Sequence, residues 1–433
     1  MLLTALAIAL GATAVYLFVT NVNTTAFIFR ESSVSKVYFA DHISPAHSAV
    51  IELFNRTHAG KIEVIPVDLN FSKFSTNERK ELLARSLRSK SDRLDIFSVD
   101  YIWTPRFAKW CVDLNPYVPA PAQRNIIPPA IRSCIYNDRL VAMPLYIDIG
   151  VMYYRTDIIN RLPNAAEIDR KLQSSIGWDE LIALQKKLKY DNRPFYIFQA
   201  NDYEGLICNY FEIISSLEPE FFANNQIDLR SDVAKRSLQY LVDLVHAQKA
   251  SPLKVTEFDE NKSYEYMLDS NAVFVRGWPN FVENFRKIYS DTSKFSSIGR
   301  AAIPHFQGNR PTSVYGGWNL MVSKFSTKKE AAIEFIRFLQ TEESQKMMFE
   351  LGGYIPVNEG IYRDSAYMRL HPDLGYYKGL VDRGFHRPFI EDYTRISDII
   401  SYFIHRAIKK EITVDEALER ASVMIDSKAL LIR

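Results

Sequence analysis

The sequence lacks the short motifs that mark most catalytic and nucleotide-binding sites. It contains no Gly-x-Ser-x-Gly, no His-Glu-x-x-His and no phosphate-binding glycine loop. Its three cysteines have none of the spacings that hold a metal ion. The formal net charge is only +2 and no block of lysine and arginine occurs, which argues against a nucleic-acid surface. We therefore expect no cofactor, no metal ion and no nucleic-acid partner.

Cysteine is scarce, and the three thiols are Cys111, Cys134 and Cys208. In an oxidising compartment Cys111 and Cys134 could form a disulfide, which would leave Cys208 free. The alternative is that all three are buried free thiols. The sequence leaves both alternatives open.

Long apolar runs are absent except at the N-terminus. Residues 1–19 carry no charged side chain, and Arg30 is the first one. This length suits either a long signal peptide or one membrane-spanning helix. The run contains no lipobox cysteine, which excludes a lipoprotein anchor. We therefore expect residues 1–30 to be a signal peptide or a membrane anchor, and the remainder to be exported.

The rest of the chain has the composition of a globular protein, with 47% hydrophobic and 24% charged residues. Its 433 residues exceed what one hydrophobic core usually supports, so two lobes are expected. Strand-like runs at 37–40, 62–67 and 94–100 alternate with helical patterns, which predicts an α/β fold with parallel strands. Ligands bind at the carboxyl ends of such strands, and Asp100 ends the third run.

A Gly-Gly-Trp segment, Gly316 to Trp318, precedes a short apolar strand at 320–322. The two glycines allow close approach of the backbone to a ligand, because no Cβ stands in the way. The indole of Trp318 offers a flat apolar face that suits a sugar ring. The segment is therefore either a binding loop or a hairpin turn beside a core tryptophan.

Six short motifs occur in a fixed order along the chain, and they begin at Asp95, Met143, Tyr203, Arg276, Gly316 and Arg387. Together they resemble the motifs of extracellular solute-binding proteins, the ligand-capturing subunits of ABC importers. Within that group they are most similar to the trehalose/maltose-binding branch. The resemblance extends from about Val37 to the C-terminus.

The resemblance implies a periplasmic-binding-protein-like fold, in which two α/β lobes flank a ligand cleft and several chain crossings form the hinge. We expect residues 31–145 and 300–345 to form lobe I. Residues 146–299 and 346–433 would form lobe II. The closed, liganded form would dock as a monomer on the permease subunits of an ABC transporter, at the periplasmic or extracellular face of the cytoplasmic membrane.

The resemblance also implies which residues contact a di- or oligosaccharide. Carboxylates of Asp100 and Asp148 would accept hydrogen bonds from sugar hydroxyls, and Arg79 and Arg387 would donate to them. Paired carboxylate and guanidinium groups match a sugar's hydroxyl rim. The remaining expected contacts are the Tyr146 side chain, the backbone at Gly316 and Gly317, and the rings of Trp278 and Trp318, which would stack on sugar rings.

The sequence departs from the family pattern at two places. The stretch Asp41 to His47 lacks the glutamate that often reaches the sugar, and Asn280 stands where related proteins carry an aromatic residue. The sugar's identity therefore stays open. A membrane-tethered sugar sensor is one alternative function, and a glycoside hydrolase that uses Asp100 and Asp148 is another. We expect a binding protein and not an enzyme.

Overall fold

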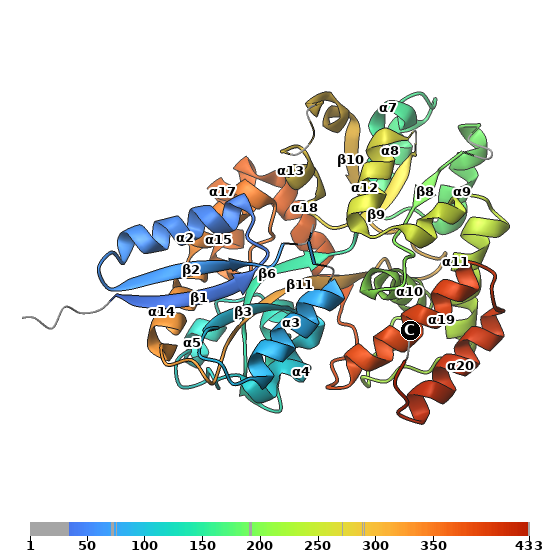
Figure 1. The fold of residues 1–433 in the computed structure, drawn as a ribbon. Helices are drawn as coiled ribbons and strands as arrows, with labels where there is room; N and C mark the ends of the chain where they lie inside the picture. The colour runs from blue at the N-terminus through green and yellow to red at the C-terminus, as the bar shows by residue number, and fades with distance from the viewer. Residues whose placement is uncertain are drawn as a thin grey trace, which may run out of the picture.

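The computed structural model describes residues 34–70, 73–74, 76–189, 193–270, 272–287, 289 and 291–431. They form two α/β lobes that lie side by side, each with its own sheet (Figure 1). The predicted two-lobed α/β fold is therefore confirmed. The expected signal peptide or anchor, residues 1–30, lies outside the described residues. Among the helices of the described ranges, none is both long and apolar enough to cross a membrane.

The first lobe is built on a sheet of six strands in the order β12-β11-β3-β1-β2, with β6 paired to the other edge of β11. β1 runs parallel to β2 and β3, whereas β11 runs antiparallel to β3 and β6. Every residue of β6 and β11 is buried, as expected for strands covered on both faces. The strands are β1 (Ser35–Asp41), β2 (Ile62–Asp68), β3 (Ile96–Asp100), β6 (Met143–Ile149), β11 (Ser313–Val322) and β12 (Gly384–Phe385).

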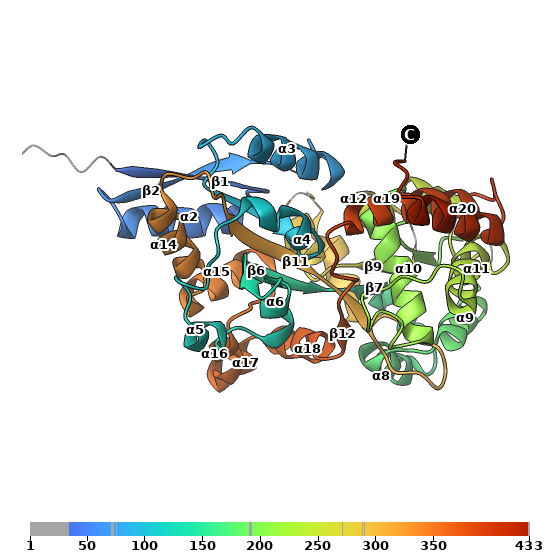
Figure 2. The same ribbon diagram turned by 90° about the horizontal axis from the view of Figure 1, so that it is seen from below.

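Helices cover both faces of this sheet. Figure 2 shows α3 (Thr76–Arg88) on one face and α2 (Pro45–Thr57), α14 (Lys329–Leu339) and α15 (Glu342–Gly352) on the other. Phe54 of α2 packs edge-on against Phe335 of α14, with ring centroids 4.9 Å apart. Shorter elements complete the lobe: α4 (Thr104–Phe107), α5 (Ala120–Gln123), α6 (Pro128–Arg132), β4 (Ile135–Tyr136), β5 (Arg139–Leu140), α16 (Glu359–Arg363), α17 (Ser365–Leu370) and α18 (Pro372–Val381).

The second lobe contains a four-stranded sheet in the order β10-β7-β9-β8. Its strands are β7 (Val151–Arg155), β8 (Tyr196–Ile197), β9 (Phe274–Gly277) and β10 (Ile298–Ala301). The C-terminal helices pack beside α10 and α11 at the lower right in Figure 1. The helices are α7 (Thr156–Ile159), α8 (Ala165–Ser174), α9 (Trp178–Lys187), α10 (Glu204–Leu217), α11 (Asp232–His246), α12 (Glu260–Asp269), α13 (Phe281–Phe285), α19 (Tyr393–Ile408) and α20 (Val414–Asp426).

The chain passes between the lobes at three places: between β6 and β7, between β10 and β11, and between α18 and α19. The boundary expected at residue 145 falls inside β6, which stays in the first sheet to Ile149. The segment after residue 345 begins in α15, which packs on α2 of the first lobe. We therefore propose shifted boundaries, with residues 34–149 and 313–385 in the first lobe and residues 151–312 and 386–431 in the second.

The disulfide considered between Cys111 and Cys134 is wrong, because both cysteines are free and buried, as is Cys208. The thiol of Cys111 lies 3.2 Å from the carbonyl oxygen of Phe107. The thiol of Cys134 lies 3.3 Å from Oδ1 of Asn319. Each sulfur is therefore packed in a different part of the first-lobe core.

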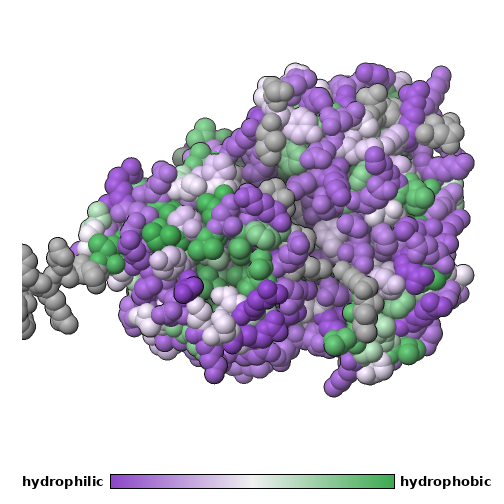
Figure 3. All heavy atoms as spheres, viewed as in Figure 1, coloured by the Kyte–Doolittle hydropathy of each residue, from purple (hydrophilic) through white to green (hydrophobic). Residues whose placement is uncertain are grey.

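The surface of the first lobe shows an apolar area in the view of Figure 3, whereas the second lobe is mostly polar in that view. Among the exposed apolar side chains of the first lobe are Val67 in β2 and Leu82 in α3. β2 is the edge strand of the six-stranded sheet.

Candidate ligand-binding site

The Gly-Gly-Trp segment lies inside β11. The sequence suggested a binding loop or a hairpin turn there, and both predictions of irregular structure were wrong. The strand register explains which residues it meets. Trp318 pairs with Asp100 of β3 on one side and with Tyr146 of β6 on the other. Gly316 pairs with Asp148. Four side chains that the resemblance assigned to the ligand therefore lie in neighbouring strands where the two lobes meet.

The two glycines make room for neighbouring groups. Gly317 has a φ of +122°, and a Cβ there would lie 2.5 Å from the carbonyl oxygen of Tyr146. A Cβ at Gly316 would lie 2.9 Å from Cζ3 of Trp278 and 3.2 Å from Cβ of Asp148. Glycine is thus required for packing at both positions, and Trp278 of the second lobe reaches the first-lobe sheet there.

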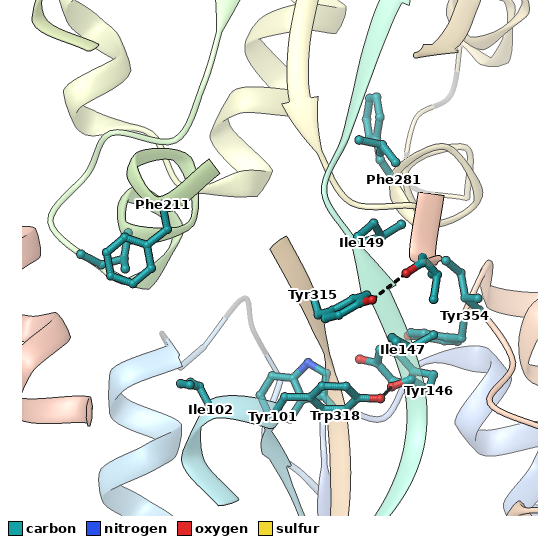
Figure 4. Packing of buried hydrophobic residues seen from close by; sticks show 14 of the residues in the cluster. Tyr101, Ile102, Tyr146, Ile147, Ile149, Phe211, Phe281, Tyr315, Trp318 and Tyr354 are labelled. Atoms are coloured by element: carbon teal, nitrogen blue, oxygen red, sulfur yellow. Dashed lines mark hydrogen bonds between the residues drawn. The ribbon is translucent and has the colours of Figure 1, made fainter. Parts of the chain in front are cut away.

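Trp318 lies between an aromatic and a cationic neighbour. Cζ of Arg79 lies 4.3 Å from the centroid of the Trp318 ring, and Trp103 meets the ring edge-on at 5.8 Å. Figure 4 shows Trp318 beside Tyr101, whose hydroxyl donates to the backbone oxygen of Tyr146 at 3.0 Å. The ring is therefore held on several sides before any ligand binds.

The guanidinium of Arg79 is fully buried and donates from Nη2 to Oδ1 of Asp41 at 3.0 Å. His47 lies near the other oxygen of Asp41, at 3.5 Å. Burial lowers the pKa of His47 to about 4, so the imidazole is neutral at pH 7 and Arg79 is the cation that compensates Asp41. Asp41 is the last residue of β1, and it marks the carboxyl end of a parallel strand as Asp100 does.

Trp278 has a similar environment in the second lobe. Cζ of Arg276 lies 4.0 Å from the Trp278 ring centroid, and the indole N–H donates to Oε1 of Glu260 at 3.3 Å. The hydroxyl of Tyr203 donates to the other oxygen of Glu260 at 2.8 Å. Burial raises the pKa of Glu260, and the hydrogen bond from Tyr203 opposes that shift.

Asp148 is buried, and its Oδ1 has no hydrogen-bond partner among the described residues. Burial and, to a smaller extent, the nearby carboxylate of Asp100 raise the pKa of Asp148 to about 7, and Arg276 opposes this shift. A buried polar atom without a partner is costly. A ligand hydroxyl is the kind of group that would supply the missing hydrogen bond.

Arg387 connects the two lobes. Its Nη2 lies 3.0 Å from Oδ1 of Asp100 in the first lobe, and its Nη1 lies 2.7 Å from Oε1 of Glu204 in the second. The hydroxyl of Tyr393 also donates to Glu204. The side chain is 2% exposed, and Nη2 also lies 3.4 Å from the carbonyl oxygen of Tyr315.

The structure thus brings all nine expected site residues to the junction of the lobes, and their contact with a ligand stays a prediction. Arg79 and Arg387 are paired with carboxylates within the protein. The sequence interpretation missed Asp41, Glu260 and the role of Arg276. Asp41 could have been found by the rule that drew attention to Asp100, because both end parallel strands of one sheet.

Comparison with known proteins identifies relatives of one kind. Residues 49–370 match the family model described as bacterial extracellular solute-binding protein. A probable ABC transporter-binding protein of Deinococcus radiodurans is 26% identical over 355 residues, which cover 79% of this chain and 82% of that protein. A probable amino-acid ABC transporter periplasmic-binding protein of Sinorhizobium fredii is 20% identical over 408 residues, which cover 92% of this chain and 91% of that protein.

Among solved structures, the maltose-bound MalE3 of T. maritima superposes with a TM-score of 0.79 at 25% identity. The match covers 91% of this chain and 99% of that one. These relatives are solute-binding proteins of ABC transporters and not enzymes, so the expectation of a binding protein is confirmed. With a family model that spans most of its length, the chain belongs to the bacterial extracellular solute-binding proteins.

Proposed function

We propose that this protein captures a di- or oligosaccharide of the trehalose or maltose type and delivers it to the permease of an ABC importer. The observation that carries the proposal is the pair of tryptophans at the lobe junction, Trp278 from the second lobe and Trp318 from the first. Asp148 lies beside Trp278 at Gly316, and its Oδ1 has no partner among the described residues. Flat apolar rings beside a carboxylate acceptor complement the C–H faces and hydroxyls of a sugar.

The mechanism we propose is closure of the lobes on the ligand. The three chain crossings give a hinge, and the ligand would contact Trp278 and Trp318 together only when the lobes are closed. A ligand that prefers the closed state shifts the population toward it. The maltose bound to the T. maritima MalE3 structure supports this ligand class.

Calorimetric titration tests the proposal. We expect saturable heat with at least one of trehalose, maltose, sucrose and glucose, and a smaller radius of gyration in solution scattering when that sugar is present. A mixture of amino acids serves as the competing ligand class, in view of the Sinorhizobium relative. Binding of an amino acid without binding of any sugar would overturn the carbohydrate assignment.

A further inference from the structure

The two tryptophans share one arrangement, although they come from different lobes. Cζ of Arg79 lies 4.3 Å from the centroid of Trp318, and Cζ of Arg276 lies 4.0 Å from the centroid of Trp278. A guanidinium over an indole is a favourable cation–π contact, and it is stronger where water is excluded. Both arginines are fully buried, so each stacks on its ring from the protein side.

Each arginine is held in turn by a buried carboxylate. Arg79 is paired with Asp41 at 3.0 Å. Arg276 is bound by both oxygens of Glu212, at 2.9 and 3.2 Å, and its Nη1 has no hydrogen-bond partner among the described residues. A bidentate pair fixes the plane of a guanidinium. The plane of the guanidinium then constrains the plane of the ring stacked on it.

The in-plane rotation of Trp278 is fixed by a separate contact. The indole N–H donates to Oε1 of Glu260, and Tyr203 holds the opposite oxygen of that carboxylate. Trp278 is also the more exposed of the two stacked rings, because it is half-buried whereas Trp318 is buried. The indole's one polar group is therefore used within the protein, and the ring is not fully buried.

We infer that Arg79, Arg276 and Glu260 are positioning residues: the arginines hold the two tryptophans from behind, and Glu260 sets the rotation of Trp278, so that each ring offers one fixed face to a sugar. This inference rests on the proposed function, and it reassigns Arg79 from a sugar donor to a ring support. Fixing the rings during folding lowers the ordering cost that binding would otherwise include.

Fluorine NMR on the full chain labelled with 5-fluorotryptophan tests the positioning without any ligand. The chain has five tryptophans, and the resonance that disappears in Trp278→Phe is that of Trp278. Glu260→Leu should shift and broaden that resonance, and Glu260→Gln, which keeps an acceptor, should restore it. The resonance of Trp178, a core ring packed on Tyr196 and Tyr240, should stay unchanged and serves as the control. An unaltered Trp278 resonance in Glu260→Leu would overturn the inference.

Affinity provides the second readout. Glu260→Leu should weaken binding of the sugar found by titration on the order of tenfold, whereas Glu260→Gln should retain it. Removing Arg276 alone would leave Glu212 buried without its partner, so the double variant Glu212→Gln/Arg276→Met is the better test of the stack and should also weaken binding.

Lys324→Met is the matched control, because Lys324 is exposed and lies 5.3 Å from the ring centroid of Phe325, within the first lobe. It should leave affinity unchanged. If Glu260→Leu and Glu212→Gln/Arg276→Met both bind the sugar as tightly as wild type, the positioning role is overturned. If wild type binds no sugar, the proposed function fails instead, and the NMR result alone then decides whether the ring is positioned.

Discussion

The guanidinium of Arg387 lies 3.0 Å from the carboxylate of Asp100, so two residues expected to contact a ligand contact each other. Glu204 of the other lobe shares the same guanidinium at 2.7 Å. One cation therefore compensates two carboxylates, one from each lobe. A buried charge network of this kind is costly to break at one member, because the remaining charges lose their compensation.

Arg387→Met should lower the free energy of unfolding by about 3 to 5 kcal/mol, because it leaves Asp100 and Glu204 without their cation. Denaturant unfolding measures the change. The double variant Arg387→Met/Asp100→Asn should be less destabilised than the sum of the two single changes. Arg230→Met is the control, since Arg230 pairs with Glu419 and Asp426 on the exposed surface, and it should alter stability little. If the double variant loses as much free energy of unfolding as the two single variants together, the residues do not form a coupled network.

Trp318→Ala should weaken sugar binding by about 1 to 3 kcal/mol, by analogy with the stacking of bases on aromatic side chains. Titration calorimetry with the best sugar ligand gives the difference. Because Trp318 is buried, thermal unfolding of the variant must show that it is folded at the titration temperature. A folded Trp318→Ala protein with wild-type affinity would show that the ring makes no contact with the ligand.

The affinity for sugar should depend on pH through Asp148, whose pKa lies at about 7. If the carboxylate accepts a ligand hydroxyl, binding favours the ionised form, so affinity rises as pH increases through 7 and falls as pH decreases below it. Titrations at pH 6, 7 and 8 measure the slope. Asp148→Asn should remove this dependence. The same slope in wild type and Asp148→Asn would exclude Asp148 as its source.

The free energy of unfolding should decrease with rising pH because of Asp148, whereas the affinity for sugar should increase. The folded-state pKa of Asp148 lies above its usual value of 3.8, so the folded protein binds more protons than the unfolded chain between pH 4 and 7. Its contribution to stability therefore declines as pH rises through this window, by roughly 4 kcal/mol at most.

Asp148→Asn should thus stabilise the ligand-free protein at pH 8 relative to wild type, and it should give less benefit at pH 5. Denaturant unfolding at both pH values supplies the comparison. A benefit of equal size at the two pH values would mean that ionisation of Asp148 is not the cause.

The sequence predicted the α/β class because hydrophobic periodicity and strand–helix alternation are local signals, and its length predicted two lobes. It also placed Asp100 at the end of a strand, because strand ends are visible in a sequence. The same reasoning did not place Gly316 and Gly317 in a strand, since glycine normally weakens strands. They are in β11 because Tyr146 and Trp278, distant in sequence, occupy the space of their side chains. Such requirements arise only from tertiary packing.

The ion pairs of the site were unpredictable for a related reason. Arg387 and Asp100 are 287 residues apart, and Arg79 and Asp41 are 38 apart. Charged residues at separate motifs can pair with a ligand or with one another, and composition does not decide between these outcomes. The sequence likewise could not decide between a disulfide and free thiols, because only the fold shows that the Cys134 thiol lies beside Asn319.

Gly317→Ala should be strongly destabilising, for two separate reasons. Its φ of +122° strains any residue with a Cβ, and the new Cβ would lie 2.5 Å from the backbone oxygen of Tyr146. Gly308→Ala is the matched control, since Gly308 has a φ of +86° and no atom within 4 Å of the added Cβ. It carries the conformational strain without the clash and should cost about 1 kcal/mol. Gly317→Ala should cost about 3 kcal/mol or more in denaturant unfolding, because the clash adds to the strain. Equal losses in the two variants would show that β11 can shift to accept a side chain beside Tyr146.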